Sequence, residues 1–373
     1  MLVFILGGIA AIGSGLVLAA AWASWRFGAR LGAAPLGRAE PVSLLKPLHG
    51  AEPQLRANLQ SFLDQDWAAP ITLVAGIQRE SDPAAEAVAA LATGDDRRAV
   101  LVADARRHGA NAKVGNLINM APAADADLIV LSDSDIAAPR DYLSCIAGAL
   151  ATPGVGAVTC AYAGRGDGGF WSLLGAAMLS YQFLPSVLFA DALGTGDACM
   201  GSTIALRREM LTRIGGFEAF ADILADDHAI GAAVRAQGLQ VALAPVIVTH
   251  GSVEPSLPAL LRHELRWAAT VRDLNPGRML GMTLLHPLPF ALAALALAPG
   301  WATGALVALA IGTRLTVAAV VDGLTGRKTA PWLLLPLRDL LTFGVHVSCF
   351  FVRRVEWQGA RLAMREAGRI EAQ

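Results

Sequence analysis

The stretch that decides the fold is Leu128-Ile-Val-Leu-Ser-Asp-Ser-Asp-Ile136. Its branched apolar run, Leu128 to Leu131, is typical of a central strand in a parallel sheet that is covered on both faces. Asp133 and Asp135 follow at the carboxyl end of this strand, the edge where open α/β sheets bind ligands. Two carboxylates one residue apart can share a hard divalent cation, which neutralises a diphosphate. The stretch predicts a metal and nucleotide site, although an Asp-Ser-Asp triplet alone also fits a turn or a helix cap.

The composition indicates a membrane protein with a soluble domain. Of the 373 residues, 54% are hydrophobic and only 16% are charged, outside the usual range of soluble proteins. The formal net charge of −1 gives no reason to expect nucleic acid as a partner. The four cysteines show no Cys-x-x-Cys spacing. We therefore expect reduced, buried thiols, as in a cytosolic domain, rather than a zinc site or a disulfide framework.

Residues 1–25 are the first predicted membrane segment. They are almost free of charge and long enough to cross a bilayer, and Trp22 and Trp25 fit an interfacial belt. A cleaved signal peptide is the alternative, but no basic region precedes the apolar run, and Arg26, Arg30 and Arg38 follow it. We predict an uncleaved anchor, and the positive-inside rule places the chain after it in the cytosol.

From residue 41 to residue 275, short apolar runs alternate with amphipathic stretches, which predicts a doubly wound, mostly parallel α/β sheet. The predicted strands are Val42–Lys46, Ile71–Ile77, Ala99–Val102, Leu128–Ser132, Gly156–Ala161 and Gln240–Ala244. The predicted helices are Glu52–Leu63, Pro83–Ala92, Lys113–Ala121, Arg140–Leu150 and Asp226–Gln237. The glycine-rich stretches Gly164–Gly169 and Gly194–Gly201 are predicted as loops. Because neither a Gly-x-Gly-x-x-Gly fingerprint nor a Walker loop is present, a dinucleotide dehydrogenase or an NTPase is poorly supported.

Residues 280–352 return to the bilayer. Leu280–Leu297 and Ala302–Val321 are two predicted spans, although two prolines break the first and Arg314 interrupts the second. The basic link after them predicts a cytosolic position after one hairpin. If Trp332–Val352 also crossed, the arginines that follow it would lie outside, against the positive-inside rule. We therefore predict a re-entrant or interfacial segment and a cytosolic tail at 353–373.

An ordered series of motifs resembles the ceramide glucosyltransferase family. It includes Val42-Ser-Leu-Leu-Lys-Pro-Leu-His-Gly50, Ser81-Asp-Pro83, Asn111-Ala-Lys113, Asp133-Ser-Asp135, Gly215-Gly-Phe217, Ala225-Asp-Asp227 and Arg266-Trp267. Within this family the sequence is most similar to the bacterial branch associated with hopanoid biosynthesis, especially at Gly201-Ser-Thr-Ile-Ala-Leu-Arg207, Arg262-His-Glu-Leu-Arg-Trp267 and His286-Pro-Leu-Pro289. The resemblance implies a Rossmann-like GT-A fold, a UDP-sugar donor, a divalent metal (Mg²⁺ or Mn²⁺), a lipid acceptor and inversion at the anomeric carbon.

The resemblance also implies roles for individual residues. Asp133 and Asp135 would hold the metal, and Asp227 would be the catalytic base. The donor site would include Lys46, Asp82, Lys113, Asp133, His263, Arg266 and Trp267. The residues themselves leave alternatives open: Lys46 also fits a solvated loop lysine, Asp82 a helix cap, and Asp226 and Asp227 a favourable charge at a helix amino terminus.

The stretch Arg262–Trp267 is predicted to lie on an amphipathic helix at the membrane surface. A spacing of three places His263 and Arg266 on one face, where both could approach the departing diphosphate. Trp267 would line the acceptor pocket. Where this chain has His263 the family usually has Gln or Arg, so here the charge depends on pH. A plain interfacial helix explains the leucines of this segment but not the ordered match.

The sequence therefore predicts a membrane-bound inverting glycosyltransferase of the bacterial inner membrane, with its catalytic domain in the cytosol. From the resemblance, the donor would be UDP-N-acetylglucosamine and the acceptor a hopanoid such as bacteriohopanetetrol. A ceramide glucosyltransferase would use the same residues. A processive polysaccharide synthase would need more spanning helices. A non-catalytic nucleotide-sugar-binding protein is disfavoured because the metal, base and Arg-Trp motifs are retained together.

Overall fold

The strand predicted to be central, β4 (Leu128–Leu131), is fully buried in an eight-stranded sheet of order β3-β2-β1-β4-β7-β6-β8-β5. The computed structural model describes residues 1–31, 37–196 and 199–352, and the backbone of 354–357, 360–364 and 370–372. On one side of β4, the strands β1 (Val42–Pro47), β2 (Ile71–Ile77) and β3 (Arg97–Ala103) are all parallel. The predicted α/β fold is confirmed.

The other half of the sheet is mixed, but four of the seven strand pairings in this eight-stranded sheet are parallel, so the predicted mostly parallel sheet is confirmed. β7 (Ile204–Arg207) is antiparallel to β4 and to β6 (Val155–Gly166), and β5 (Ile136–Ala137) is antiparallel to β8 (Gln240–Ser252). β6 and β8 are parallel and much longer than predicted, so Gly164–Gly166 belong to a strand rather than to a loop. A Cβ at Gly164 would meet the Ala176 backbone at 2.5 Å, which explains why glycine interrupts this strand.

Successive residues of the central strands point into two different cores. Leu44 and Val130 lie in a core with α2 (Leu55–Leu63), α3 (Ala84–Ala89) and α5 (Tyr142–Leu150). Leu45 and Ile129 lie in a core with α4 (Ala112–Met120), α8 (Arg208–Arg213) and α9 (Asp226–Ala236). Because both faces are covered, these strands carry apolar residues on both faces, and β4 has no polar residue at all. Short 3₁₀ segments are η1 (Ala121–Ala123), η3 (Phe217–Phe220), η4 (Thr283–Leu285) and η5 (Trp332–Leu334).

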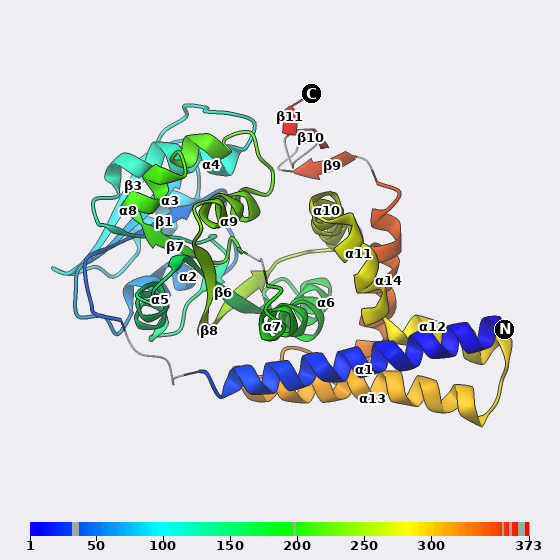
Figure 1. The fold of residues 1–373 in the computed structure, drawn as a ribbon. Helices are drawn as coiled ribbons and strands as arrows, with labels where there is room; N and C mark the ends of the chain where they lie inside the picture. Colours follow the sequence, from blue (N-terminus) through cyan, green and yellow to red (C-terminus); the bar gives the residue numbers. More distant parts are fainter. Residues whose placement is uncertain (32–36, 197–198, 353, 358–359, 365–369, 373) are drawn as a thin grey trace.

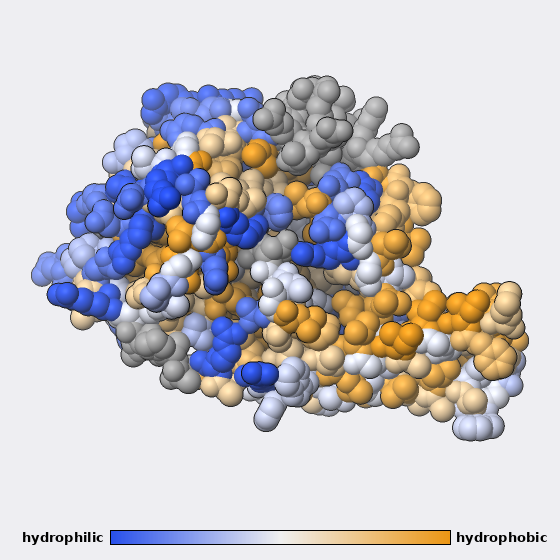
Figure 2. Space-filling view, viewed as in Figure 1, coloured by the Kyte–Doolittle hydropathy of each residue, from blue (hydrophilic) through white to orange (hydrophobic). Residues whose placement is uncertain are grey.

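Long apolar helices extend from the α/β domain (Figure 1). α1 (Leu2–Gly28) lies beside α13 (Trp301–Thr325) and α12 (Pro287–Leu297). Figure 2 shows a hydrophobic surface over this bundle and a hydrophilic one over the α/β domain. Within the described residues, three helices are long and apolar enough to cross a membrane, or four if the pair Pro276–Leu285 and Pro287–Leu297, bent by 58°, counts as one. The bend lies at the predicted proline break. The candidate spans indicate a membrane-associated protein.

One of these helices, Phe170–Ala192, was not predicted. It comprises α6 (Phe170–Met178), a π-helical turn η2 (Leu179–Phe183) and α7 (Leu184–Ala192). Of its apolar 18-residue stretch, 56% is buried inside the protein, compared with 22% of the corresponding stretch in α1 and 33% in α13. Figure 1 shows α6 and α7 nearly end-on between the sheet and α1, so this helix runs across the direction of α1 and α13. It therefore connects the α/β domain to the bundle.

Two further helices, α10 (Leu257–Leu274) and α14 (Leu335–Cys349), pack against each other, and α11 (Pro276–Met282) follows α10. Arg338 of α14 pairs with Glu264 of α10 at 2.5 Å, and Asp339 pairs with Arg314 of α13 at 2.9 Å. The arginine that interrupts the predicted span is therefore matched by a buried carboxylate. All four cysteines are free and buried, as expected.

The predicted tail contains an antiparallel sheet of β9 (Arg354–Trp357), β10 (Ala360–Met364) and β11 (Ile370–Ala372). Residues 353, 358–359, 365–369 and 373 of the tail lie outside the described residues, as do 197–198 of the predicted loop at Gly194–Gly201.

Candidate active site

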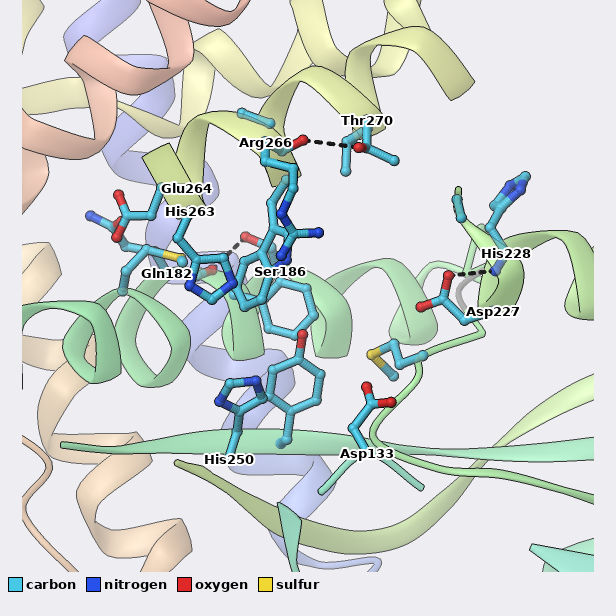
Figure 3. Close-up of a pocket in the computed structure, with 18 of the residues that line it drawn as sticks. Asp133, Gln182, Ser186, Asp227, His228, His250, His263, Glu264, Arg266 and Thr270 are labelled. Atoms are coloured by element: carbon cyan, nitrogen blue, oxygen red, sulfur yellow. Dashed lines mark hydrogen bonds between the residues drawn. The ribbon is translucent and has the colours of Figure 1, made fainter. Parts of the chain in front are cut away.

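One cavity of about 830 Å³ joins the carboxyl edge of the sheet to the helical bundle (Figure 3). Asp133, Asp135 and Asp227 line its sheet end, whereas Val17 of α1 and Val317 of α13 line its bundle end. α7, α10, α11 and α14 also contribute to the wall. A ligand in this cavity can therefore contact charged groups at one end and apolar helices long enough to span a membrane at the other.

Lys113 joins two of the segments that carry carboxylates. Its Nζ lies 2.6 Å from Asp133 Oδ1 and 3.3 Å from Asp226 Oδ2. Asn111 fixes this first turn of α4, because its side chain accepts a hydrogen bond from the Val114 amide at 3.1 Å. Although burial favours the neutral form, the surrounding carboxylates raise the pKa of Lys113 above its ordinary value. Lys113 is thus a fixed positive charge beside Asp133.

Asp227 reaches from the first turn of α9 into the cavity. Its Oδ1 accepts a hydrogen bond from the His228 amide at 2.7 Å, and its Oδ2 accepts one from the Gly201 amide at 3.0 Å. The Gly201 carbonyl in turn accepts a hydrogen bond from the Asp133 amide at 3.1 Å. Asp227 therefore does more than favour the helix amino terminus, the alternative raised above. Burial raises its pKa, while Lys113 and the two amides oppose this, and a base with a raised pKa accepts a proton more readily.

Asp135 faces His250, a residue of β8 that sequence reasoning missed. Asp135 Oδ2 lies 3.2 Å from His250 Nε2, and its Oδ1 is buried without a hydrogen-bond partner in the described chain. A divalent ion beside Asp133, Asp135 and His250 would satisfy that orphaned oxygen, so these residues fit a metal. Within the described residues no cluster of three or more His, Cys, Asp and Glu side chains is already arranged as a metal site. Mg²⁺ commonly takes only one or two carboxylates and completes its shell with phosphate and water.

Lys46 is buried, which rules out the solvated loop lysine. Its Nζ donates hydrogen bonds to Ser132 Oγ and to the Asp133 carbonyl, both at 2.9 Å, and lies 3.4 Å from the centre of the Phe62 ring. Burial lowers its pKa well below the ordinary value. Lys46 is not among the described residues that line the cavity. Its contacts hold the main chain that carries Asp133, so an influence on the donor would be indirect.

Asp82 is buried and has the contacts of a cap. Its Oδ1 accepts hydrogen bonds from the Ala84 amide at the start of α3 and from the Gly50 amide, both at 3.0 Å. Gly50 has a φ of +77°, which favours glycine at this turn after β1. The described lining of the cavity includes Leu48 and His49 of the same loop but not Asp82. Asp82 therefore holds the loop that borders the site.

α10 brings His263, Arg266 and Trp267 to the cavity (Figure 3). His263 Nδ1 lies 2.6 Å from Glu254 Oε1, and the His263 ring contacts Trp267 edge-on with a centroid distance of 4.3 Å. The Arg266 guanidinium makes no hydrogen bond or ion pair with any residue the structure describes. Burial lowers the pKa of Arg266, whereas the charges of Asp133 and Asp227 raise it. A guanidinium held opposite these carboxylates is free to bind a diphosphate.

Other cavity residues escaped the sequence analysis. Glu52 Oε1 accepts a hydrogen bond from Ser134 Oγ at 2.9 Å, and burial together with Asp135 raises the pKa of Glu52 from 4.5 to about 7. Tyr162 stacks on His250 with a centroid distance of 5.3 Å. Gln182 and Ser186 come from the unpredicted helix. His250 and Tyr162 lie in β8 and β6 beyond the ends predicted for these strands, so no pattern marked them as facing the site.

Comparison with known proteins agrees with this geometry. The sequence profile of Glycosyl transferase family 21 matches residues 5–370. Ceramide glucosyltransferase 1 of Caenorhabditis elegans is 24% identical over 228 residues, which cover 61% of this chain and 48% of that protein. The chain thus spans about half the length of this curated relative. The mannosyltransferase PcManGT of Pyrobaculum calidifontis, solved with GDP-Man and Mn²⁺, is similar in structure with a TM-score of 0.51 and 21% identity, covering 93% of this chain and 99% of the other. This likeness shows the GT-A fold.

Proposed function

We propose that this chain, which belongs to Glycosyl transferase family 21, transfers a sugar from a UDP-sugar to a hydroxyl group of a membrane lipid with inversion at the anomeric carbon. The observation that carries this proposal is the continuous cavity from Asp133 and Asp227 to α1 and α13. A nucleotide sugar needs the polar end, and a lipid needs an approach from the apolar helices. One cavity with both ends supports a reaction between the two.

In the proposed reaction Asp227 is the base. The acceptor oxygen attacks the anomeric carbon from the face opposite the diphosphate, and Asp227 takes the proton from that oxygen. The bond between the anomeric carbon and the diphosphate oxygen breaks, and UDP leaves with the electron pair. Arg266 and His263 stabilise the growing negative charge on UDP. When bound at Asp133, Asp135 and His250, a Mg²⁺ or Mn²⁺ ion supplies positive charge against the diphosphate.

We further infer that the acceptor is a hopanoid polyol and the donor UDP-N-acetylglucosamine, which rests on the motif resemblance. Ceramide is the second candidate acceptor, supported by the match to a ceramide glucosyltransferase. We place the protein in the bacterial inner membrane with its α/β domain in the cytosol. The carboxyl-terminal ends of α1 and α13 are the ends nearest the α/β domain (Figure 1). Arg26 lies in the last turn of α1 and Lys328 follows α13, which supports this orientation under the positive-inside rule.

The test is sugar transfer by the purified full-length protein in detergent with Mg²⁺ or Mn²⁺. UDP-N-acetylglucosamine and UDP-glucose are each offered with bacteriohopanetetrol and with ceramide. Asp227→Asn should lower kcat by about 10²–10⁴-fold and leave UDP binding nearly unchanged. Asp66→Asn is the matched control, because Asp66 is an exposed carboxylate whose side chain is 67% accessible. Product with ceramide alone would contradict the assignment of a hopanoid as the acceptor. Absence of both sugar transfer and UDP release with every pair would support the non-catalytic alternative.

A further inference from the structure

The bundle end of the cavity is lined by more polar groups than a hydrocarbon chain requires. These come from η2, α7, α10, the turn before α12 and α14, and they are Gln182, Ser186, Glu264, His286, Thr342 and His346. Two of them leave a buried polar atom without a hydrogen-bond partner among the described residues, namely Glu264 Oε1 and His286 Nδ1. A buried polar atom without a partner destabilises the folded protein. Two such atoms in one cavity indicate a ligand that hydrogen-bonds there.

The contacts that fix the Glu264 side chain are made by Oε2 and not by Oε1. Glu264 is 6% exposed, and its other oxygen, Oε2, pairs with Arg338 at 2.5 Å. Arg338 is itself 1% exposed and also donates a hydrogen bond to Thr342 Oγ1 at 2.8 Å. Thr342 Oγ1 in turn donates to Gln182 Oε1 at 2.6 Å. This network holds the carboxyl group rigidly at the cavity wall, and an ionised carboxylate oxygen can only accept a hydrogen bond.

The position of Glu264 separates it from the reacting centre. Figure 3 shows Glu264 and Asp227 on opposite sides of the view, with Arg266 between them. A group that contacts Glu264 is therefore several bonds away from the hydroxyl beside Asp227. An acceptor that contacts both residues needs polar groups spaced along its head group, as in a linear polyol.

We propose that Glu264 determines acceptor specificity: its Oε1 accepts a hydrogen bond from a hydroxyl of the acceptor lipid other than the one that receives the sugar. The preferred substrate class is then a lipid with an extended polyhydroxylated head group. This inference rests on the proposed function and deepens it, because it concerns the acceptor half of the same cavity. Glu264 would act by positioning the acceptor and takes no part in proton transfer.

The experiment compares two acceptors with the full-length protein. One is bacteriohopanetetrol, and the other is an analogue that keeps only its terminal hydroxyl. Because a hydrogen bond to a charged group contributes about 1.5–3 kcal/mol, the wild type should favour the polyol by about 10–150-fold in kcat/KM.

The informative variant is Glu264→Met combined with Arg338→Met. Replacing both partners avoids a buried unpaired arginine, because well-packed apolar residues often substitute for a buried ion pair without loss of stability. In this variant the ratio between the two acceptors should fall to within about threefold of one, while transfer to the single-hydroxyl analogue stays within twofold of wild type. Glu264→Gln, which retains a carbonyl acceptor, should give an intermediate ratio. Melting temperatures show whether each variant is folded.

Two outcomes would overturn the inference: equal use of both acceptors by the wild type, or an equal loss with both acceptors in the double variant. The second outcome would mark Glu264 as merely structural. Failure of the proposed function looks different, since the wild type would then transfer sugar to no acceptor. UDP release measured without acceptor separates a donor-site defect from an acceptor-site defect.

Discussion

Gly201 lies between the two carboxylates of the candidate site, so a single methyl group there should be costly. Its amide donates to Asp227 Oδ2 at 3.0 Å, and its carbonyl accepts from the Asp133 amide at 3.1 Å. A Cβ added at Gly201 would lie 2.6 Å from Asp133 Oδ2 and 3.1 Å from Lys113 Nζ. Its φ is outside the left-handed region. Gly201→Ala therefore acts only through steric contact.

The magnitude follows from the size of the overlap. An ordinary van der Waals contact for a Cβ begins at 3.4 Å, so the 2.6 Å approach forces the Asp133 carboxylate to move by most of an ångström. That carboxylate is held by Lys113 at 2.6 Å and is a candidate metal ligand. Displacement of a catalytic group by about 1 Å costs on the order of 10²-fold in rate, or about 2.7 kcal/mol. We expect a loss of this size in kcat.

The assay is metal-dependent sugar transfer with a titration of Mn²⁺. Gly201→Ala should lower kcat about 100-fold and raise the Mn²⁺ concentration needed for half-maximal activity. Gly115→Ala is the matched control, because a Cβ there has its nearest contacts at 3.7 Å and 3.8 Å although Gly115 lies only two residues from Lys113. A Gly201→Ala protein that keeps more than half of the wild-type kcat with an unchanged metal requirement would show that the Asp133 carboxylate tolerates this contact.

Two further predictions concern the same edge of the sheet. Because the folded pKa of Glu52 is about 7 and its ordinary value is 4.5, the unfolded chain loses this proton first, so stability should fall as pH rises from about 4.5 to 7. In chelator-treated protein Glu52→Gln should remove this decline and raise the free energy of unfolding above pH 7 by up to about 3 kcal/mol. Identical melting curves from pH 5 to pH 8 would contradict this. EDTA should abolish transfer and Mn²⁺ should restore it, and His250→Ala should raise the Mn²⁺ requirement at least about tenfold; an unchanged requirement would exclude His250 as a ligand.

Much of the fold could be predicted because its central strands are apolar on both faces. Ile129 and Val130 of β4 enter different cores, and the run Leu128–Leu131 carries no polar residue, so it is easily recognised. The parts that were missed gave weaker local signals. β5 has only two residues and β7 four, too few to show a period. The helix Phe170–Ala192 lies largely inside the protein, so only the tertiary structure shows its place between the sheet and the bundle.

The site was predictable where its residues follow a strand or begin a helix. Asp133, Lys113 and Asp227 all do so, and the structure brings them together around Gly201 and Asp226. His250 was missed because it lies ten residues into a strand that was expected to end earlier. For Lys46, the position at the end of a strand was predicted but its burial was not. That burial depends on contacts with Phe62 and Ser132, which belong to other elements.

α10 is where the proposed donor and acceptor halves of the cavity meet. His263 and Arg266 face the carboxylates at the sheet edge, while Glu264 reaches Arg338 of α14. Neighbouring residues on a helix point about 100° apart, so one rigid element presents different side chains to the two ends of one cavity. A lipid that binds at Glu264 and a diphosphate that binds at Arg266 would therefore fix the same helix. Each substrate would then reduce the ordering cost of the other, which favours transfer to the lipid over hydrolysis of the donor by water.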